Sequence, residues 1–193
     1  MLTFAQVHFA LSRRPLFRKV SLLGMKRLLC LFFLVVVSAV AVVRADAPDV
    51  SADLMRTLSG ETTVHLSFVT TATPDKIWRA LTIGDELTKW AAPMVKVDFR
   101  IGGTYEYYFY PKHGEGHRGM EGTKILSYVP GKMLSHTGAL VGTWVVWTIE
   151  PAGDQQAVHY YIVGNSPEWN DSAAERGTQA QELVEKLAKY LQP

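Results

Sequence analysis

Two histidines and a glutamate lie close together near the middle of the chain, where they could act as metal ligands. His113 and His117 are four residues apart, and Glu115 lies between them. On a helix this spacing would place both imidazole rings on one face, which suits zinc. A glycine stands on each side of Glu115, however, and glycine is a poor helix former. The pattern favours an exposed loop, and zinc would need a third ligand such as His136.

A pair of glycines, Gly102-Gly103, raises the question of a phosphate-binding loop. Such a loop places glycines between a strand and the N-terminus of a helix, so that backbone N–H groups meet the anion. Here the glycines stand between two stretches that are both predicted as strands. The pair is therefore interpreted as a tight turn that needs a positive φ.

Acid–base or nucleophilic catalysis has only weak support. No Gly-x-Ser-x-Gly segment occurs, and the serines in the later part of the chain have no neighbours that would activate them. A carboxyl group that faced an apolar cavity could act as a general base. Alternation along a strand places Glu106 opposite Tyr105 and Tyr107, so inward tyrosines would leave Glu106 in solvent. Candidate strand carboxylates are Asp98, Glu106, Glu121 and Glu150.

Aromatic residues are the more informative group. Tyr105 and Tyr107 share one face of a predicted strand, and Tyr108 shares the other. Trp144 and Trp147 likewise fall on opposite faces of a later strand. Some of these side chains must belong to the core. The others could line a ligand pocket, because Tyr and Trp combine a large apolar area with a hydrogen-bonding tip.

The N-terminal part of the chain has the layout of a secretory signal peptide. Met25 begins a short charged segment, and Leu28–Val43 is an almost wholly apolar run. That run of sixteen residues is short for a membrane-spanning helix, which needs about 20. We expect residues 25–45 to be a signal peptide cut after Ala45, or alternatively after Ala47. Residues 1–24 would then be an extension ahead of the true start.

Removal of the leader changes the charge of the protein. The full chain has a formal net charge of +2, but from Asp46 onward thirteen Lys or Arg face eighteen Asp or Glu, a net charge of −5. The remaining cations are scattered singly, so no nucleic-acid surface is expected. Cys30, the only cysteine, lies in the leader. The exported protein would therefore have no disulfide and no thiol nucleophile.

One domain is expected over residues 61–193, preceded by a polar tether over residues 46–60. Thr62–Val69 alternates and is rich in β-branched residues, which predicts a strand. Thr73 as N-cap and Pro74 at the first helical position predict a helix start. A second short helix is expected at about residues 85–90, with Trp90 pointing inward.

Strands and hairpins dominate the next stretch, and a long amphipathic helix ends the chain. Strands are expected over residues 95–100, 104–110, 119–129, 132–137, 142–150 and 157–163. Successive hairpins predict an antiparallel sheet. Asp171–Leu191 carries apolar residues at three- and four-residue spacing, a stripe that should face the core. They are Ala180, Leu183, Val184, Leu187 and Leu191.

This order of elements, together with four segments, resembles the START-like or SRPBCC helix-grip superfamily. The likeness is strongest to the family of heat-shock ATPase activator homologues. The four segments are Thr70–Leu81, with its Pro and Ile-Trp-Arg-Ala-Leu; Leu87–Pro93, with its tryptophan; Asp98–Tyr105, with its Gly-Gly turn; and Gly122–Leu134, with its Pro-Gly hairpin. The likeness spans about residues 62–191.

The resemblance implies an α+β helix-grip fold. In it, a curved antiparallel sheet of six or seven strands surrounds a long C-terminal helix, with two short helices after the first strand. It also implies an apolar cavity between the sheet and that helix, and no cofactor or metal. The expected occupant is a small apolar or amphipathic ligand. The expected wall residues are Trp90, Tyr105, Tyr107, Trp144, Tyr160, Leu183 and Leu187.

Three functions follow from these observations. The first is an exported ligand-binding protein, periplasmic or secreted, that touches a membrane only if its leader is retained. The second is a cyclase-like or hydrolase-like enzyme that uses a cavity histidine or carboxylate. The third is an envelope interaction protein with a filled core. The family's co-chaperone role needs a cytosolic ATPase, which an exported protein would not meet, so no protein partner is identified.

Overall fold

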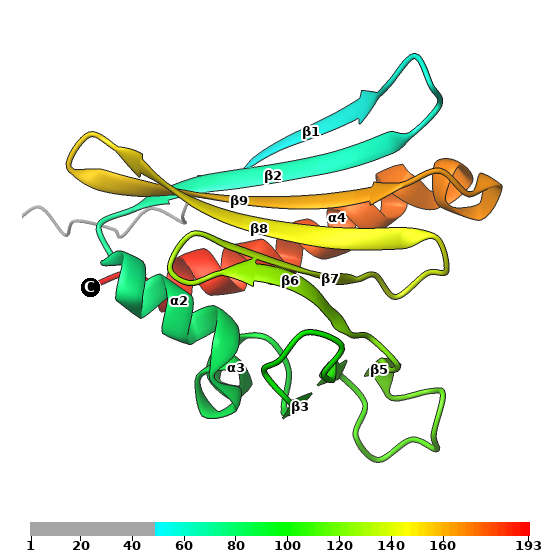
Figure 1. Ribbon diagram of the computed structural model, residues 1–193, viewed down its shortest axis with the longest axis horizontal. Helices are drawn as coiled ribbons and strands as arrows, with labels where there is room; N and C mark the ends of the chain where they lie inside the picture. The colour runs from blue at the N-terminus through cyan, green and yellow to red at the C-terminus, as the bar shows by residue number, and fades with distance from the viewer. Residues whose placement is uncertain (1–48) are drawn as a thin grey trace, which may run out of the picture. The chain divides into compact units, whose positions relative to one another are not determined.

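The structure is a computed structural model that describes residues 49–193, which form an α+β domain (Figure 1). The predicted signal peptide and upstream extension lie outside the described residues. Within the described range no helix is long and apolar enough to cross a membrane. The predicted α+β class and antiparallel pairing are both confirmed.

The larger sheet contains six antiparallel strands in the order β1-β2-β9-β8-β7-β6. Long central strands make its middle, where β8 and β9 form a hairpin through the turn at Gly153. Alternation is strict along β2, whose even-numbered residues from Thr62 to Thr70 are buried. The bounds are Ser51–Arg56 for β1, Thr62–Thr70 for β2, Ile125–Val129 for β6, Met133–Thr137 for β7, Thr143–Ala152 for β8 and Gln155–Gly164 for β9.

A second sheet of three short strands, which the sequence did not predict, is joined to the start of β6 by a bridge between Thr104 and Lys124. It contains β3 (Met94–Val97), β4 (Tyr105–Tyr108) and β5 (Gly119–Met120). The single strand expected over residues 119–129 is therefore wrong. Gly122 adopts a φ of 75°, which turns the chain, and its N–H donates to Glu106 at 2.6 Å. This turn separates β5 from β6.

The strand β1 corrects a second expectation. Residues 46–60 were expected to be a tether, but Ser51–Arg56 pairs with β2 along its whole length. All six of its residues are exposed, so it adds an edge without adding core. Its sequence has no sustained alternation of apolar and polar residues, so the hydrophobic pattern does not predict a strand here.

The two short helices begin and end as the sequence indicates. In α2 (Pro74–Thr82) the Thr73 side chain accepts from the N–H of Lys76, and Pro74 occupies the first turn. In α3 (Gly84–Trp90) the buried side chains are Leu87 and Trp90. The Trp90 indole N–H donates to the carbonyl of Ala80 at 3.0 Å, which fastens α3 to α2.

The helix α4 (Pro167–Tyr190) lies along one face of the larger sheet (Figure 1). It begins one turn earlier than expected because Ser166 caps it and Pro167 follows. Trp169 anchors this first turn: it is buried, and its indole N–H donates to the carbonyl of Thr62 at 2.8 Å. Gly177 lets the helix approach β2 closely, since a Cβ there would lie 3.3 Å from Val64.

Candidate ligand-binding pocket

A pocket of about 710 Å³ opens between α4 and one end of the larger sheet. Its sheet side is formed by inward residues of β8 and β9, and its helix side by the buried stripe of α4. Loops on either side complete the wall. The apolar lining residues are Val145, Tyr160, Ile162, Trp169, Ala180, Leu183, Ala91, Pro93, Phe109, Met120 and Leu140.

The packing of α4 explains why space remains at this end. Gly177 brings the helix against β2, on the far side of β9 from β8. On its pocket side the helix presents Ala180, a small residue that lines the pocket. Protein interiors are otherwise filled at crystal-like density, and a methyl group at this position leaves space that a larger side chain would occupy.

The rim of the pocket is polar. Arg176, Gln179, Glu182 and Lys186 line it from α4, in line with the helical repeat. Arg176 is half-buried and its Nε donates to Ser172 Oγ at 3.2 Å. Within residues 49–193 no carboxylate lies in ion-pair contact with Arg176 or Lys186. Two cations on the helix therefore border an apolar interior.

Two of the expected wall residues, Tyr160 and Leu183, line this pocket. Four others are buried in the core away from it. Tyr105 donates to the carbonyl of Leu81 at 2.6 Å, and Tyr107 donates to Tyr105 Oη at 2.8 Å. Trp90 and Leu187 are also buried. These four side chains fill the space that α2 and α3 cover.

Trp144 does not face the interior, which corrects the expectation that it forms part of the wall. Its side chain is 37% exposed on the outer face of β8, while Val145 and Trp147 point inward. The reason is register. Tyr160 faces the interior and pairs with Trp147, so the inward residues of β8 are the odd-numbered ones.

Glu106 is another correction, because it is buried and not in solvent. It accepts hydrogen bonds from Tyr108 Oη and from the N–H of Gly122, both at 2.6 Å. All four residues of β4 are buried, so both faces of this strand are covered. The carboxylate is occupied in holding the turn between β5 and β6 and does not reach the pocket.

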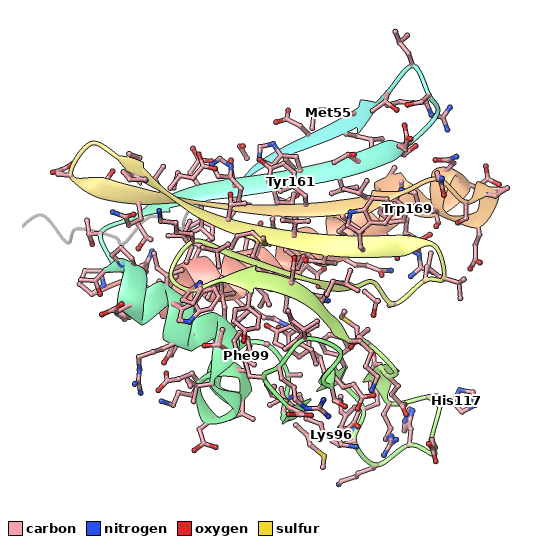
Figure 2. The ribbon with its side chains drawn as sticks, in the orientation of Figure 1. Met55, Lys96, Phe99, His117, Tyr161 and Trp169 are labelled. Atoms are coloured by element: carbon pink, nitrogen blue, oxygen red, sulfur yellow. The ribbon has the colours of Figure 1, made fainter. Side chains whose placement is uncertain are left out.

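The loop interpretation of the histidine pair is confirmed. His113, Glu115 and His117 are exposed, and His113 stacks on Tyr110 at 5.2 Å between ring centroids. His117 points away from the domain at the tip of the β4–β5 loop (Figure 2). Gly102 has the positive φ, 76°, that the turn interpretation requires. His136, the third ligand that zinc would have needed, is buried in the core and is not part of this exposed loop.

Three polar side chains lie on the inner face of the larger sheet, one in the pocket wall and two on neighbouring strands. Tyr160 lines the pocket and is 4% exposed; burial raises the pKa of its phenol, so it stays neutral. Trp147 packs on it at 4.4 Å between ring centroids. His136 pairs in register with the pocket residue Val145. The His136 Nε2 and Trp147 Nε1 atoms have no hydrogen-bond partner within the described range.

His136 is neutral and is not part of the pocket lining. Burial lowers the pKa of His136 to about 4, so the ring is neutral near pH 7. Its Nδ1 lies 2.8 Å from the carbonyl of Thr137, which makes that nitrogen the donor and Nε2 a bare acceptor. Among the residues that do line the pocket, the charged side chains of Arg176, Glu182 and Lys186 stand at the rim, and Tyr160 is a neutral phenol.

Sequence reasoning missed most of the lining. Val145 and Ile162 follow from the phase of the strands once Tyr160 is placed inward. The sequence signal for the register was the turn of the β8–β9 hairpin. Ala152 pairs with Gln155 across this turn, and this first pair determines which residues of β8 and β9 face each other along the whole hairpin. The rim residues Arg176 and Lys186 were not identifiable, because a charge on an amphipathic helix is ordinarily solvated.

Comparisons with known proteins agree with this fold. A solved structure of CalU16 from Micromonospora echinospora is similar at 17% identity, with a TM-score of 0.55, over 77% of this chain and 88% of that one. The Aha1 dimer from Colwellia psychrerythraea is similar at 22% identity, with a TM-score of 0.55, over 67% of this chain and 96% of that one. No curated protein matches.

These structural likenesses establish the helix-grip fold. A family model gives the relationship itself. The model described as "Activator of Hsp90 ATPase homolog 1-like protein" matches residues 71–192, from the residue after β2 through α4 almost to the C-terminus. The chain therefore belongs to the family of activator of Hsp90 ATPase homolog 1-like proteins.

Proposed function

We propose that this protein is exported and binds a small apolar or amphipathic molecule in the pocket between β8, β9 and α4. The observation that carries the proposal is the pocket itself, about 710 Å³ with apolar walls from sheet, helix and loops. That volume lies in the range of small-molecule sites, roughly 300–1,000 Å³. Burial of apolar ligand surface would supply most of the binding free energy.

The amphipathic character of the ligand is supported by the contrast between interior and rim. Tyr160, Ile162 and Leu183 form an apolar interior, while Arg176 and Lys186 border the opening. A molecule with an apolar body would bury that body against the sheet and leave a polar end near these cations. Export is supported by the apolar run Leu28–Val43 behind a charged segment.

A fluorescent apolar probe, N-phenyl-1-naphthylamine, tests binding directly. We expect the purified protein to bind it with saturable fluorescence enhancement. Ala180→Trp should weaken this binding at least tenfold, because an indole at this position fills the pocket. Ala174→Trp is the matched control: Ala174 lies on the same helix but is exposed, so binding should change less than twofold.

Two results would count against the proposal. One is the absence of saturable binding by a folded protein, and the other is an equal effect of the two tryptophan substitutions. Melting temperatures of both variants establish that they remain folded. Intact mass of the protein recovered from a bacterial host checks export, with Asp46 as the expected first residue. A full-length mass in the envelope fraction would mean a retained leader.

A further inference from the structure

The hydroxyl groups of the buried tyrosines divide into two kinds. On β4, Tyr105 donates to Leu81, Tyr107 donates to Tyr105, and Tyr108 donates to Glu106. Tyr160 is 4% exposed, yet no side-chain or backbone hydrogen bond to its hydroxyl is found within residues 49–193. A phenol buried to this extent ordinarily has a partner. Tyr160 is also the one of these four that lines the pocket.

Among the described residues, two other side chains on the inner face of the sheet have a nitrogen that is both buried and unpaired, whereas the Tyr160 hydroxyl is reached from the pocket. Trp147 is its register partner on β8, and the Trp147 indole N–H is a donor without an acceptor. His136 lies on β7, opposite Val145, and its Nε2 is an acceptor without a donor. Tyr160 and Trp147 thus form a patch that carries a phenol and an unpaired donor. His136, whose ring lies 4.8 Å from that of Tyr105, has an unpaired acceptor on β7. Leaving the two nitrogens unpaired and buried costs stability.

The charge of the complementary group follows from what surrounds the patch. Within the described range no lysine or arginine is buried. The nearest cations along the pocket, Arg176 and Lys186, stand at its rim on α4. A carboxylate brought to the patch would lose its hydration without gaining a counter-ion. An uncharged oxygen meets no such cost, and it can accept from a phenol or an indole N–H.

We propose that the ligand carries an uncharged oxygen, as a hydroxyl or a carbonyl, on the end that enters first, and that Tyr160 Oη is its hydrogen-bond partner. This inference rests on the proposed function and adds the ligand class. The ligand is then an apolar molecule with polar groups at both ends: an uncharged oxygen against Tyr160 and a group near the cations of the rim. Trp147, whose indole N–H is unpaired, packs on Tyr160 at 4.4 Å between ring centroids.

A pair of probes that differ in one oxygen tests this. The affinities of 4-phenylphenol and biphenyl are measured by displacement of N-phenyl-1-naphthylamine, and the ratio of the two dissociation constants is the readout. Tyr160→Phe should lower the preference for 4-phenylphenol about fivefold, the effect of one buried hydrogen bond. Tyr161→Phe is the matched control. It is the next residue of β9, on the outer face, where it stacks on His65, and the ratio should stay within twofold of wild type.

The possible outcomes separate this inference from the proposed function. If N-phenyl-1-naphthylamine does not bind, the proposed function fails and the inference fails with it. If the probe binds but Tyr160→Phe leaves the ratio of dissociation constants unchanged, the pocket binds apolar molecules without a hydrogen bond to their oxygen. Only the inference is then overturned. A drop in the ratio for Tyr161→Phe equal to that for Tyr160→Phe would also overturn it. Tyr160→Phe removes one oxygen atom, and its melting temperature establishes that the variant is folded.

Discussion

The space between the larger sheet and α4 has two ends that are built from the same kinds of residue. One end is filled by side chains, and the other is an open pocket. The closed end, covered by α2 and α3, is filled by Trp90, Tyr105, Tyr107 and Leu187. The open end, beside Ala180 and Leu183, is the pocket, with Tyr160 at its inner limit. Both ends use buried tyrosines on strands and a buried tryptophan on a helix, Trp90 at the closed end and Trp169 at the open end.

Hydrogen bonding is what distinguishes them. At the closed end the polar tips find fixed partners: Trp90 donates to Ala80, and a chain runs from Tyr107 through Tyr105 to Leu81. At the open end the Tyr160 hydroxyl has no partner within residues 49–193. Trp147 and His136, each with one unpaired nitrogen, lie between the two ends, where their rings pack on Trp90 and Tyr105. An aromatic residue in this fold therefore contributes to stability where its polar group is paired, and its polar group is available to a ligand where it is unpaired and borders the pocket.

The largest expected effect comes from two leucines one turn apart on α4. Leu187→Ala should lower the free energy of unfolding by about 2–5 kcal/mol, because Leu187 is fully buried at the closed end and its loss leaves a cavity. Leu183→Ala should cost clearly less, because Leu183 already faces an empty space. Urea denaturation followed by circular dichroism measures both. Equal losses would mean that the open end is as tightly packed as the closed one.

The second prediction concerns pH and His136. Burial lowers the pKa of His136 to about 4, whereas an unfolded histidine titrates near 6.5. Between these values the unfolded chain binds more protons, so this stability is complete above pH 6.5 and is lost as the pH falls to about 4. The difference corresponds to roughly 3 kcal/mol for one site.

The variant His136→Phe isolates this contribution. Urea denaturation of wild type and variant between pH 7 and pH 4 should give a stability difference that moves in favour of the variant as the pH falls. The pKa of His65 is also lowered by burial, but His65 is present in both proteins and cancels. A stability difference that is independent of pH would mean that His136 is accessible to solvent.

Much of the fold follows from local patterns in the sequence. Thr73-Pro74 marks the start of α2, and the apolar stripe from Ala180 to Leu191 marks α4 as a core helix. These signals are strong because capping and helical periodicity act within a few residues. The turn at Gly122 and the edge strand β1 were missed, since both depend on a distant partner: Glu106 for the turn and β2 for the strand.

The site was less predictable, for a physical reason. Aromatic residues on both faces of β4 and β8 make alternation ambiguous, and only the pairing of Trp147 with Tyr160 places Trp144 outside. Whether a buried tyrosine fills space or borders it depends on how close α4 comes to the sheet. Gly177 allows a close approach to β2, and Ala180 is a small residue in the pocket lining. Neither residue type on its own indicates a pocket in the sequence.

The smallest predicted effect compares the hydroxyl groups of two tyrosines in the absence of ligand. Tyr105→Phe should lower the free energy of unfolding by about 1–3 kcal/mol, because it removes the bond to Leu81 and leaves Tyr107 without its acceptor. Tyr160→Phe should change it by less than about 0.5 kcal/mol or raise it, because the lost hydroxyl had no partner within the protein. Urea denaturation with a shared m-value measures both. If the two substitutions cost the same, the Tyr160 hydroxyl is already paired in the unliganded protein, and the two ends of the space differ in packing alone.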